Sequence, residues 1–183
     1  MSILSVVGAV APASQIFGVF GAGLLTGYSF STSYSVNPVL LSSNLPTSKL
    51  VRLWDDLFEH GASFAKVMTP LSSAALFLAA YHRSHSHSFT PTVFGLHPST
   101  QLTLSGALLM SGLPFTLLFI FPTSVYKLKE RVAGMNQGKG SDKDMTASDK
   151  AGFRQELKMF GSRNAIRAGI WAVAFVLGLT VDV

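Results

Sequence analysis

The chain has 183 residues, of which 48% are hydrophobic and only 13% are charged. A water-soluble domain usually carries about a quarter of its residues as charges, whereas residues 1–48 of this chain contain no Lys, Arg, Asp or Glu. This composition excludes an ordinary soluble domain and predicts an integral membrane protein. Because the sequence has no cysteine, it also excludes a disulfide framework, a thiolate nucleophile, an iron–sulfur cluster and a cysteine-based zinc site.

Four apolar segments approach the roughly 20 residues that a membrane-spanning helix needs. They cover about residues 14–41, 62–81, 102–121 and 165–180. We therefore predict an all-α fold, a four-helix transmembrane bundle that forms one domain over residues 1–183. Residues 1–13 lack the basic segment of a signal peptide, so we interpret them as an apolar extension that enters the first helix at Pro12. Pro38 is expected to bend or end that helix.

The connection between the first two spans contains an amphipathic pattern. Residues 47–60 place apolar side chains on one helical face, at Leu50, Leu53, Trp54, Leu57 and Phe58. This pattern predicts a separate interfacial helix over about 50–58 that ends before Gly61. Residues 134–150 are polar and predict a loop, and residues 148–160 predict an amphipathic helix that runs into the fourth span.

The distribution of basic residues predicts the orientation in the membrane. The loops over residues 42–61 and 122–163 hold eleven Lys and Arg, and the opposite side holds Arg83. By the positive-inside rule these two loops lie in the cytosol, and we expect a multi-pass protein of the endoplasmic reticulum or a vesicle membrane, surrounded by lipid. The net charge of +5 then reflects topology. No nucleic-acid partner is predicted, because no aromatic residues are interleaved with the basic ones.

Polar side chains at membrane depth are candidate site residues, because burying them in lipid is costly. Asn164 and Arg167 share one face of the fourth span and could hold a phenolate or enolate oxygen. Alternatively, Arg167 reaches out to cytosolic lipid phosphates. Hydroxyl groups crowd the second half of the first span, and lipid offers them no partners. Tyr28, Ser31 and Ser35 are therefore expected to face inward and bind substrate.

Histidine is the side chain best matched to proton transfer at neutral pH. His60 is predicted to be a catalytic base on the cytosolic side, where Arg167 also lies. The alternatives are an ordinary solvated residue at a helix end, or a base at His82 on the other side. The spacing of His82, His85 and His87 fits no standard metal site, so no metal is predicted. The glycines of the first span favour close helix packing, within the bundle or in a homodimer.

Two motifs carry a family resemblance. The third span ends in PFTLLFIFPTS over residues 114–124, and the fourth opens with Asn164 and Arg167 in an Asn-x-x-Arg pattern. Together with Trp54, Gly61 and the Pro in the second span, these residues resemble the DUF1772 family of small four-helix membrane proteins, which includes the fungal anthrone oxygenases. The likeness runs in order over nearly the whole chain. Ser124 stands where relatives often have Asn, and Phe160 where they often have Trp.

The resemblance implies oxidation of a polycyclic polyketide anthrone to an anthraquinone by O2, without a cofactor. A base removes the C10 proton, and the resulting electron-rich anion reduces O2. The resemblance adds Trp54, Phe115 and Thr116 to the expected substrate-binding residues. For the implied reaction we expect catalytic roles for Asn164 and Arg167 at the oxyanion and for His60 as the base. The alternatives are a non-catalytic membrane scaffold, a related membrane enzyme acting on another polyketide or terpenoid, and a small carrier.

Overall fold

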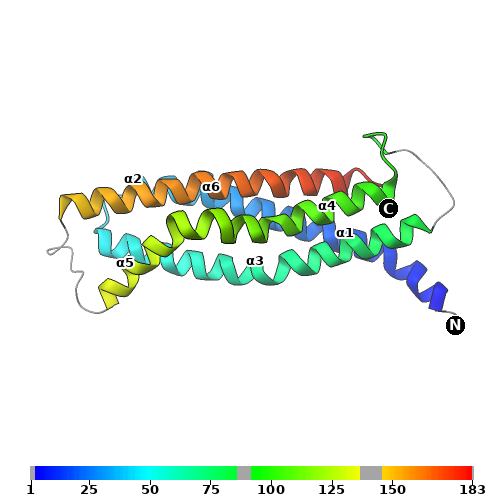
Figure 1. Cartoon of the computed structure of the whole chain (residues 1–183), viewed down its shortest axis with the longest axis horizontal. Coiled ribbons are helices and arrows are strands. Elements are labelled where there is room, and N and C mark those ends of the chain that lie inside the picture. The colour runs from blue at the N-terminus through cyan, green and yellow to red at the C-terminus, as the bar shows by residue number, and fades with distance from the viewer. Residues whose placement is uncertain (1–2, 86–91, 137–145, 183) are drawn as a thin grey trace. The chain divides into compact units, whose positions relative to one another are not determined.

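The computed structural model describes residues 3–85, 92–136 and 146–182 (Figure 1). The elements are α1 (Ile3–Ser31), η1 (Thr32–Val36), α2 (Asn37–Ser42), α3 (Thr47–Ser84), α4 (Pro98–Phe115), η2 (Thr116–Val125), α5 (Tyr126–Asn136) and α6 (Ala147–Leu179), where η denotes a π-helix. Adjoining elements form four continuous helical runs, over residues 3–42, 47–84, 98–136 and 147–179. The described residues contain no strand, so the predicted all-α fold with four helices is confirmed.

Two of the helical runs are long and apolar enough to cross a membrane. They are Thr47–Ser84 and Pro98–Met135, and they contain the predicted spans 62–81 and 102–121. Residues 14–41 and 165–179 are also helical, but their helices are not among these two candidates. The spanning role of the first and fourth runs therefore stays a prediction.

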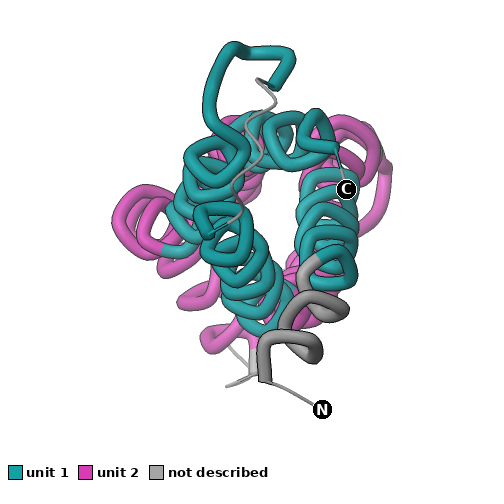
Figure 2. The backbone as a smooth tube through the Cα atoms, turned by 90° about the vertical axis from the view of Figure 1, so that its right-hand side faces the viewer, with its two compact units in different colours: residues 1–27, 65–113, 168–183 teal, residues 28–64, 114–167 magenta. Residues whose placement is uncertain are grey.

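The chain divides into two compact units, coloured in Figure 2. Unit 1 comprises residues 1–27, 65–113 and 168–183, and unit 2 comprises residues 28–64 and 114–167. Each of the four helical runs contributes a segment to each unit. The predicted site residues Tyr28, His60, Asn164 and Arg167 all belong to unit 2.

Unit 1 is held together by close helix packing and by side chains that bond to the backbone of neighbouring helices. Ser105 donates to the carbonyl oxygen of Ala174 at 2.6 Å, and Trp171 Nε1 donates to that of Leu109 at 3.0 Å. A Cβ placed on Gly112 would lie 2.2 Å from Trp171 Nε1. The missing side chain therefore admits the indole, as small residues do where membrane helices pack.

The glycines of the first helix are used inside unit 1. A Cβ on Gly18 would lie 2.6 Å from a side-chain atom of Leu76, and one on Gly21 would lie 1.9 Å from the Ser72 hydroxyl. Gly18 and Gly21 therefore pack against α3, as expected for close packing within one chain.

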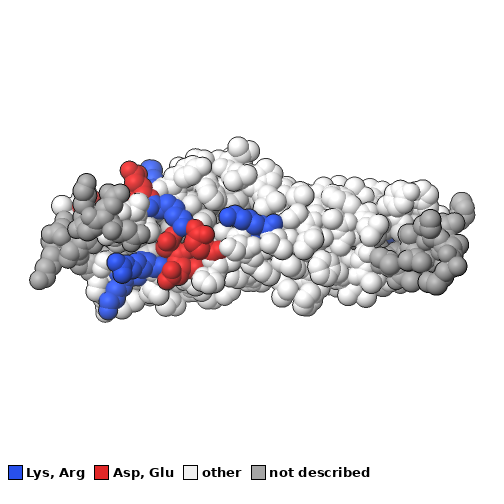
Figure 3. Space-filling view, turned by 90° about the horizontal axis from the view of Figure 1, so that it is seen from below, with Lys and Arg blue, Asp and Glu red and all other residues white. Residues whose placement is uncertain are grey.

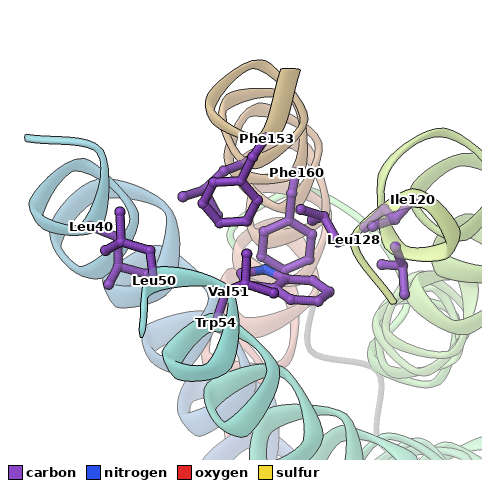
Figure 4. Packing of buried hydrophobic residues seen from close by; sticks show 10 residues of the cluster. Leu40, Leu50, Val51, Trp54, Ile120, Leu128, Phe153 and Phe160 are labelled. Atoms are coloured by element: carbon purple, nitrogen blue, oxygen red, sulfur yellow. The ribbon is translucent and has the colours of Figure 1, made fainter. Parts of the chain in front are cut away.

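The core of unit 2 gathers apolar side chains from α2, α3, η2, α5 and α6 (Figure 4). Its buried members are Leu40, Leu50, Val51, Trp54, Ile120, Val125, Leu128, Phe153, Leu157 and Phe160. Fully burying one large apolar side chain is worth about 1.5–3 kcal/mol. The start of α3 contributes three residues to this core, whereas Leu53 and Leu57 of the predicted apolar face are exposed.

The predicted end of a helix at Gly61 is wrong. Residues 50–58 are helical as expected, but they form the first turns of the continuous helix α3 rather than a separate interfacial helix. Tyr28 explains the glycine, because a Cβ at position 61 would lie 2.1 Å from the Tyr28 hydroxyl oxygen. That hydroxyl donates to the carbonyl of Leu57 at 3.1 Å. Gly61 therefore makes room for an aromatic ring in the middle of a helix.

The first helical run does not end at Pro38. Its backbone widens into the π-helix η1, where the backbone N–H of Asn37 donates to the carbonyl of Thr32, five residues earlier. Pro38 then occupies the first turn of α2, where a missing N–H costs little. Pro12 likewise lies inside α1 rather than at its start.

The second π-helix, η2, contains Pro122 and closes where the Tyr126 amide donates to the carbonyl of Phe121. A proline inside a helix removes one backbone donor, and wider turns help to accommodate this loss. π-helical segments are rare and are often found at functional sites. Both π-helices of this chain carry side chains of the polar network described next.

Candidate active site

Arg167 on α6 is held by side chains from three helices of unit 2. Its Nη1 donates to the hydroxyl of Thr116 in η2 at 2.9 Å, and its Nη2 donates to the Ser29 hydroxyl in α1 at 3.4 Å. Nη2 also donates to the amide oxygen of Asn164, one turn earlier on α6. These three partners are neutral side chains, and together they fix the orientation of the guanidinium.

Asn164 connects Arg167 to the first helical run. It is 1% exposed, and its Nδ2 donates to the Ser29 carbonyl at 3.0 Å and to the Ser33 hydroxyl at 2.8 Å. The Ser33 hydroxyl in turn donates to the Ser29 carbonyl at 2.8 Å. We call Ser29, Ser33, Thr116, Asn164 and Arg167 the polar network.

The polar network has the composition of an oxyanion site. A guanidinium held by fixed hydrogen bonds in apolar surroundings can stabilise negative charge that develops on a substrate oxygen, and the Asn164 amide keeps it oriented. Because the bonds already orient the donors, little reorganisation is needed when the charge appears. The predicted pairing of Asn164 with Arg167 is present, and Thr116 joins them.

A groove of about 480 Å³ lies beside the polar network in unit 2. Residues of η1, α2 and α6 line it: Ser33, Tyr34, Asn37, Pro38, Leu41, Lys158, Gly161, Ser162, Ala165 and Ile166. Sites for small molecules typically have volumes of about 300–1,000 Å³, so the groove has the volume of such a site. Ser33 belongs to both the groove and the polar network and so joins the two.

Asn37 forms part of the inner wall of the groove. Its Nδ2 donates to the Leu157 carbonyl at 3.0 Å, and a Cβ on Gly161 would lie 2.1 Å from this nitrogen. Glycine at position 161 therefore lets the amide reach α6. Among the described residues no hydrogen bond to Asn37 Oδ1 is recorded, which leaves an acceptor in the lining of the groove.

The expected orientation of the first helix is wrong for two of its three named residues. Ser31 and Ser35 are exposed, whereas Ser29 and Ser33 are buried. Residues four apart share a helical face, and Ser29, Ser33 and Asn37 follow this spacing. Tyr28 lies at the margin, bonded to Leu57 and 6.2 Å from the Phe64 ring by centroid. Ser31 and Ser35 are also four residues apart, so this spacing alone does not identify the buried pair in the sequence.

His60 is an exposed residue of α3. Its Nδ1 lies 2.7 Å from the carbonyl of Asp56, one turn earlier. Since a carbonyl can only accept, Nδ1 carries the proton, and Nε2 of the neutral ring keeps a lone pair directed away from this bond. The contacts described for His60 do not include the polar network, so the structure does not bring His60 together with Asn164 and Arg167.

The two aromatic candidates pack into the core. Trp54 is 2% exposed and lies 5.2 Å from the Phe58 ring and 5.6 Å, edge-on, from Phe160. Phe115 stacks on Phe119 at 5.2 Å and is packed against the same core. Neither residue lines the groove. Their packing supports the helices that carry the polar network.

Ion pairs lie elsewhere on unit 2. Lys129 pairs with Asp55 and Glu59, and Arg131 makes a bidentate pair with Glu156 at 2.8 and 3.0 Å. Figure 3 shows basic and acidic side chains gathered on one part of the face that it presents. Within the described residues no three His, Cys, Asp or Glu side chains come together as metal ligands. Of the histidines at positions 82, 85 and 87, His87 lies outside the described residues.

The comparison with protein families places these residues in a known context. The model of the anthrone oxygenase family matches residues 54–177. This range covers more than half of the chain and includes Thr116, Asn164 and Arg167. Comparisons with curated proteins and with solved structures gave no match. The family match alone is sufficient to conclude that the chain belongs to the anthrone oxygenase family.

Proposed function

We propose that this protein oxidises a polyketide anthrone to the corresponding anthraquinone with O2 and without a metal or organic cofactor. The single observation that carries this proposal is the polar network of unit 2, in which a guanidinium and an amide are fixed beside a groove of suitable size. Family membership supports an oxygenase. The protein acts as a multi-pass protein of the endoplasmic reticulum or a vesicle membrane, where anthrones and O2 both dissolve.

The reaction requires the loss of one proton from C10 of the anthrone. The resulting anion is an electron-rich phenolate, and it transfers an electron to O2. Recombination at C10 forms a C–O bond, and protonation gives a hydroperoxide. Loss of water then creates the second carbonyl, so that one anthrone and one O2 yield one anthraquinone and one water.

The side chains of unit 2 divide this work. Arg167 stabilises the oxygen that becomes negative when C10 loses its proton, because a fixed donor holds developing charge better than mobile water does. Asn164 positions the guanidinium, since its own two N–H bonds are donated to Ser29 and Ser33. The groove excludes water from one face of the rings. His60 is the only histidine in the sequence of unit 2, and its Nε2 can accept a proton at neutral pH.

A test of this function uses the full chain in phosphatidylcholine vesicles with a hydroxyanthrone and O2. Quinone absorbance and O2 uptake should rise together in equal amounts, at a rate above that of spontaneous oxidation. Arg167→Gln should lower kcat by about 10²–10³-fold, as loss of an oxyanion donor does. Lys150→Gln, on the same helix but outside the network and the groove, should retain the wild-type rate.

Two outcomes would contradict the proposal. If wild-type vesicles oxidise the anthrone no faster than empty vesicles, the protein is not this oxygenase and a scaffold becomes the better account. If a chelator abolishes the rate and a metal restores it, the reaction is metal-dependent. A chelator-resistant rate that falls in Arg167→Gln supports both the reaction and the site.

A further inference from the structure

The groove beside the polar network has one cation in its lining. We propose that Lys158 selects anthrones that carry an ionised carboxylate, and that it does so by pairing with this group while the rings lie in the groove. This inference rests on the proposed function, because it takes the groove as the anthrone site. It goes further in naming the class of substrate and the residue that chooses it.

The position of Lys158 on α6 supports the assignment. Lys158, Gly161, Ser162 and Ala165 follow the spacing of a single helical face, and all four line the groove. Lys158 therefore lies on the same face of α6 as the other residues of this helix near the start of the groove lining, Gly161, Ser162 and Ala165. The ion pairs recorded among the described residues use Lys129 and Arg131, and none is recorded for Lys158.

The remaining lining suits a flat aromatic molecule with hydroxyl groups. Pro38, Leu41 and Ile166 provide apolar surface, and the exposed Tyr34 ring extends it, stacked at 5.5 Å on Phe30. Asn37 Oδ1 can accept from a phenolic hydroxyl. The groove thus combines apolar walls, an acceptor and a cation in a space of about 480 Å³.

The charge of Lys158 decides between classes of anthrone. A carboxyl group has an ordinary pKa near 4 and is ionised at neutral pH, whereas a phenol with a pKa near 10 is not. A lysine ammonium binds an anion as a point charge. Such a pair discriminates between an acid and its neutral ester of nearly the same shape. An anionic phospholipid headgroup shares this chemistry, so the experiment must separate the two sources of the anion.

The test compares a hydroxyanthrone carboxylic acid with its methyl ester, which removes the charge and keeps the rings. The full chain is assayed in vesicles of phosphatidylcholine. For the wild type we expect kcat/KM for the acid to exceed that for the ester by about twofold to fivefold, the range of a solvent-exposed ion pair. In Lys158→Gln the ratio should fall to about one through a higher KM for the acid, with the ester unchanged. Lys158→Arg and Lys150→Gln should keep the wild-type ratio.

Several outcomes would overturn the inference. A wild-type enzyme that oxidises both compounds equally well keeps its function and loses the proposed selectivity. An equal loss with both compounds in Lys158→Gln would indicate a structural role. If neither compound is oxidised above the spontaneous rate, the function fails. Equilibrium binding of the unreactive anthraquinone carboxylic acid and its ester still tests the groove, because the acid should bind more tightly only when Lys158 is present.

Anionic phospholipid in the vesicles distinguishes the lipid source. If Lys158 binds a lipid headgroup, Lys158→Gln will change the activity only in vesicles that contain anionic lipid, and it will change it equally for the acid and the ester. That result would overturn the inference. If Lys158 serves the substrate, the preference for the acid persists in pure phosphatidylcholine, and anionic lipid weakens it at most by competition.

Discussion

Ser29 supplies a hydroxyl to the guanidinium of Arg167 in unit 2, at a distance of 3.4 Å. Ser29→Ala removes this contact and leaves the Ser29 carbonyl, which still accepts from Asn164. A hydrogen bond to a charged group is worth about 1.5–3 kcal/mol, so we expect kcat/KM for anthrone oxidation to fall about tenfold or more. Ser31→Ala, two residues away on the exposed side, should leave it unchanged. The reverse pattern would mean that the first helix is turned as the sequence suggested.

His60 presents an unprotonated Nε2 when its ring is neutral, because Nδ1 donates to Asp56. If it is the base that takes the C10 proton, His60→Ala should lower kcat far more than it changes KM, since the group acts in the transition state. Added imidazole should restore part of the rate. Steady-state kinetics of His60→Ala and His82→Ala test this assignment. If His60→Ala keeps wild-type turnover and His82→Ala has none, His82 is the base and His60 is not.

Sequence spacing was sufficient to pair Asn164 with Arg167, because two polar residues three apart on an apolar helix stand out. It was not sufficient for their partners on the first helix. Hydroxyl residues there occupy every face, so periodicity could not distinguish Ser29 and Ser33 from Ser31 and Ser35. The buried pair is defined by contacts with α6, which are distant in sequence and leave no local pattern.

Gly61 lies within α3 because the Tyr28 ring occupies the place of its side chain. Replacing an interior helical glycine by alanine usually stabilises a helix by about 1 kcal/mol. At position 61 the new Cβ would collide with the ring, and overpacking of this kind costs about 1–3 kcal/mol. We therefore expect Gly61→Ala to lower the midpoint of thermal unfolding in detergent.

Gly134 in α5 provides the matched control, since nothing lies within 4 Å of the position of its Cβ. Gly134→Ala should leave the unfolding midpoint unchanged or raise it. A second substitution, Tyr28→Ala, should relieve the strain of Gly61→Ala. If Gly61→Ala is as stable as Gly134→Ala, the close approach of Tyr28 is not what keeps this position glycine.

Helix α6 begins with a reciprocal cap. The Thr146 amide donates to Asp149 Oδ2 at 3.1 Å, and the Asp149 amide donates to the Thr146 hydroxyl at 3.2 Å. Hydrogen bonds from the Thr146 hydroxyl and amide lower the pKa of Asp149 from its ordinary value of 3.8. The stability that this cap contributes is therefore present above pH 3.8 and is lost as the pH falls through the lower pKa of the folded state.

Carbon-detected NMR of the Asp149 carboxyl can follow this titration. Its midpoint should lie below 3.8 in the wild type and move up toward that value in Thr146→Ala, because both the hydroxyl donor and the reciprocal acceptor are lost. An unchanged midpoint in the variant would show that Thr146 does not cap the helix. The sequence indicated this helix but not its cap, since Thr146 closes a polar segment in which many residues could serve.

At the scale of the whole chain, composition alone predicted a helical membrane protein, because a quarter of the sequence lacks any charge. It could not predict the two compact units, since their boundaries at Gly27, Phe64, Leu113 and Arg167 fall inside continuous helices. The comparison of Lys and Arg on the two sides of the membrane also leaves out Lys66. Lys66 is exposed within α3, inside a predicted span, where a long side chain can extend its ammonium toward the membrane surface.

Single-cysteine labelling can test the predicted orientation, because the chain has no cysteine to replace first. Lys49→Cys and Lys127→Cys lie in the two basic connections, and Val93→Cys lies in the connection between α3 and α4, where Val93 is 81% exposed. In sealed microsomes with the cytosolic face outward, an impermeant maleimide should label the first two and should reach the third only after permeabilisation. The reason is the cost of carrying clustered Lys and Arg across the bilayer, which retains basic loops in the cytosol. Labelling of Val93→Cys alone in sealed vesicles would place the basic loops and the groove residue Lys158 on the lumenal side.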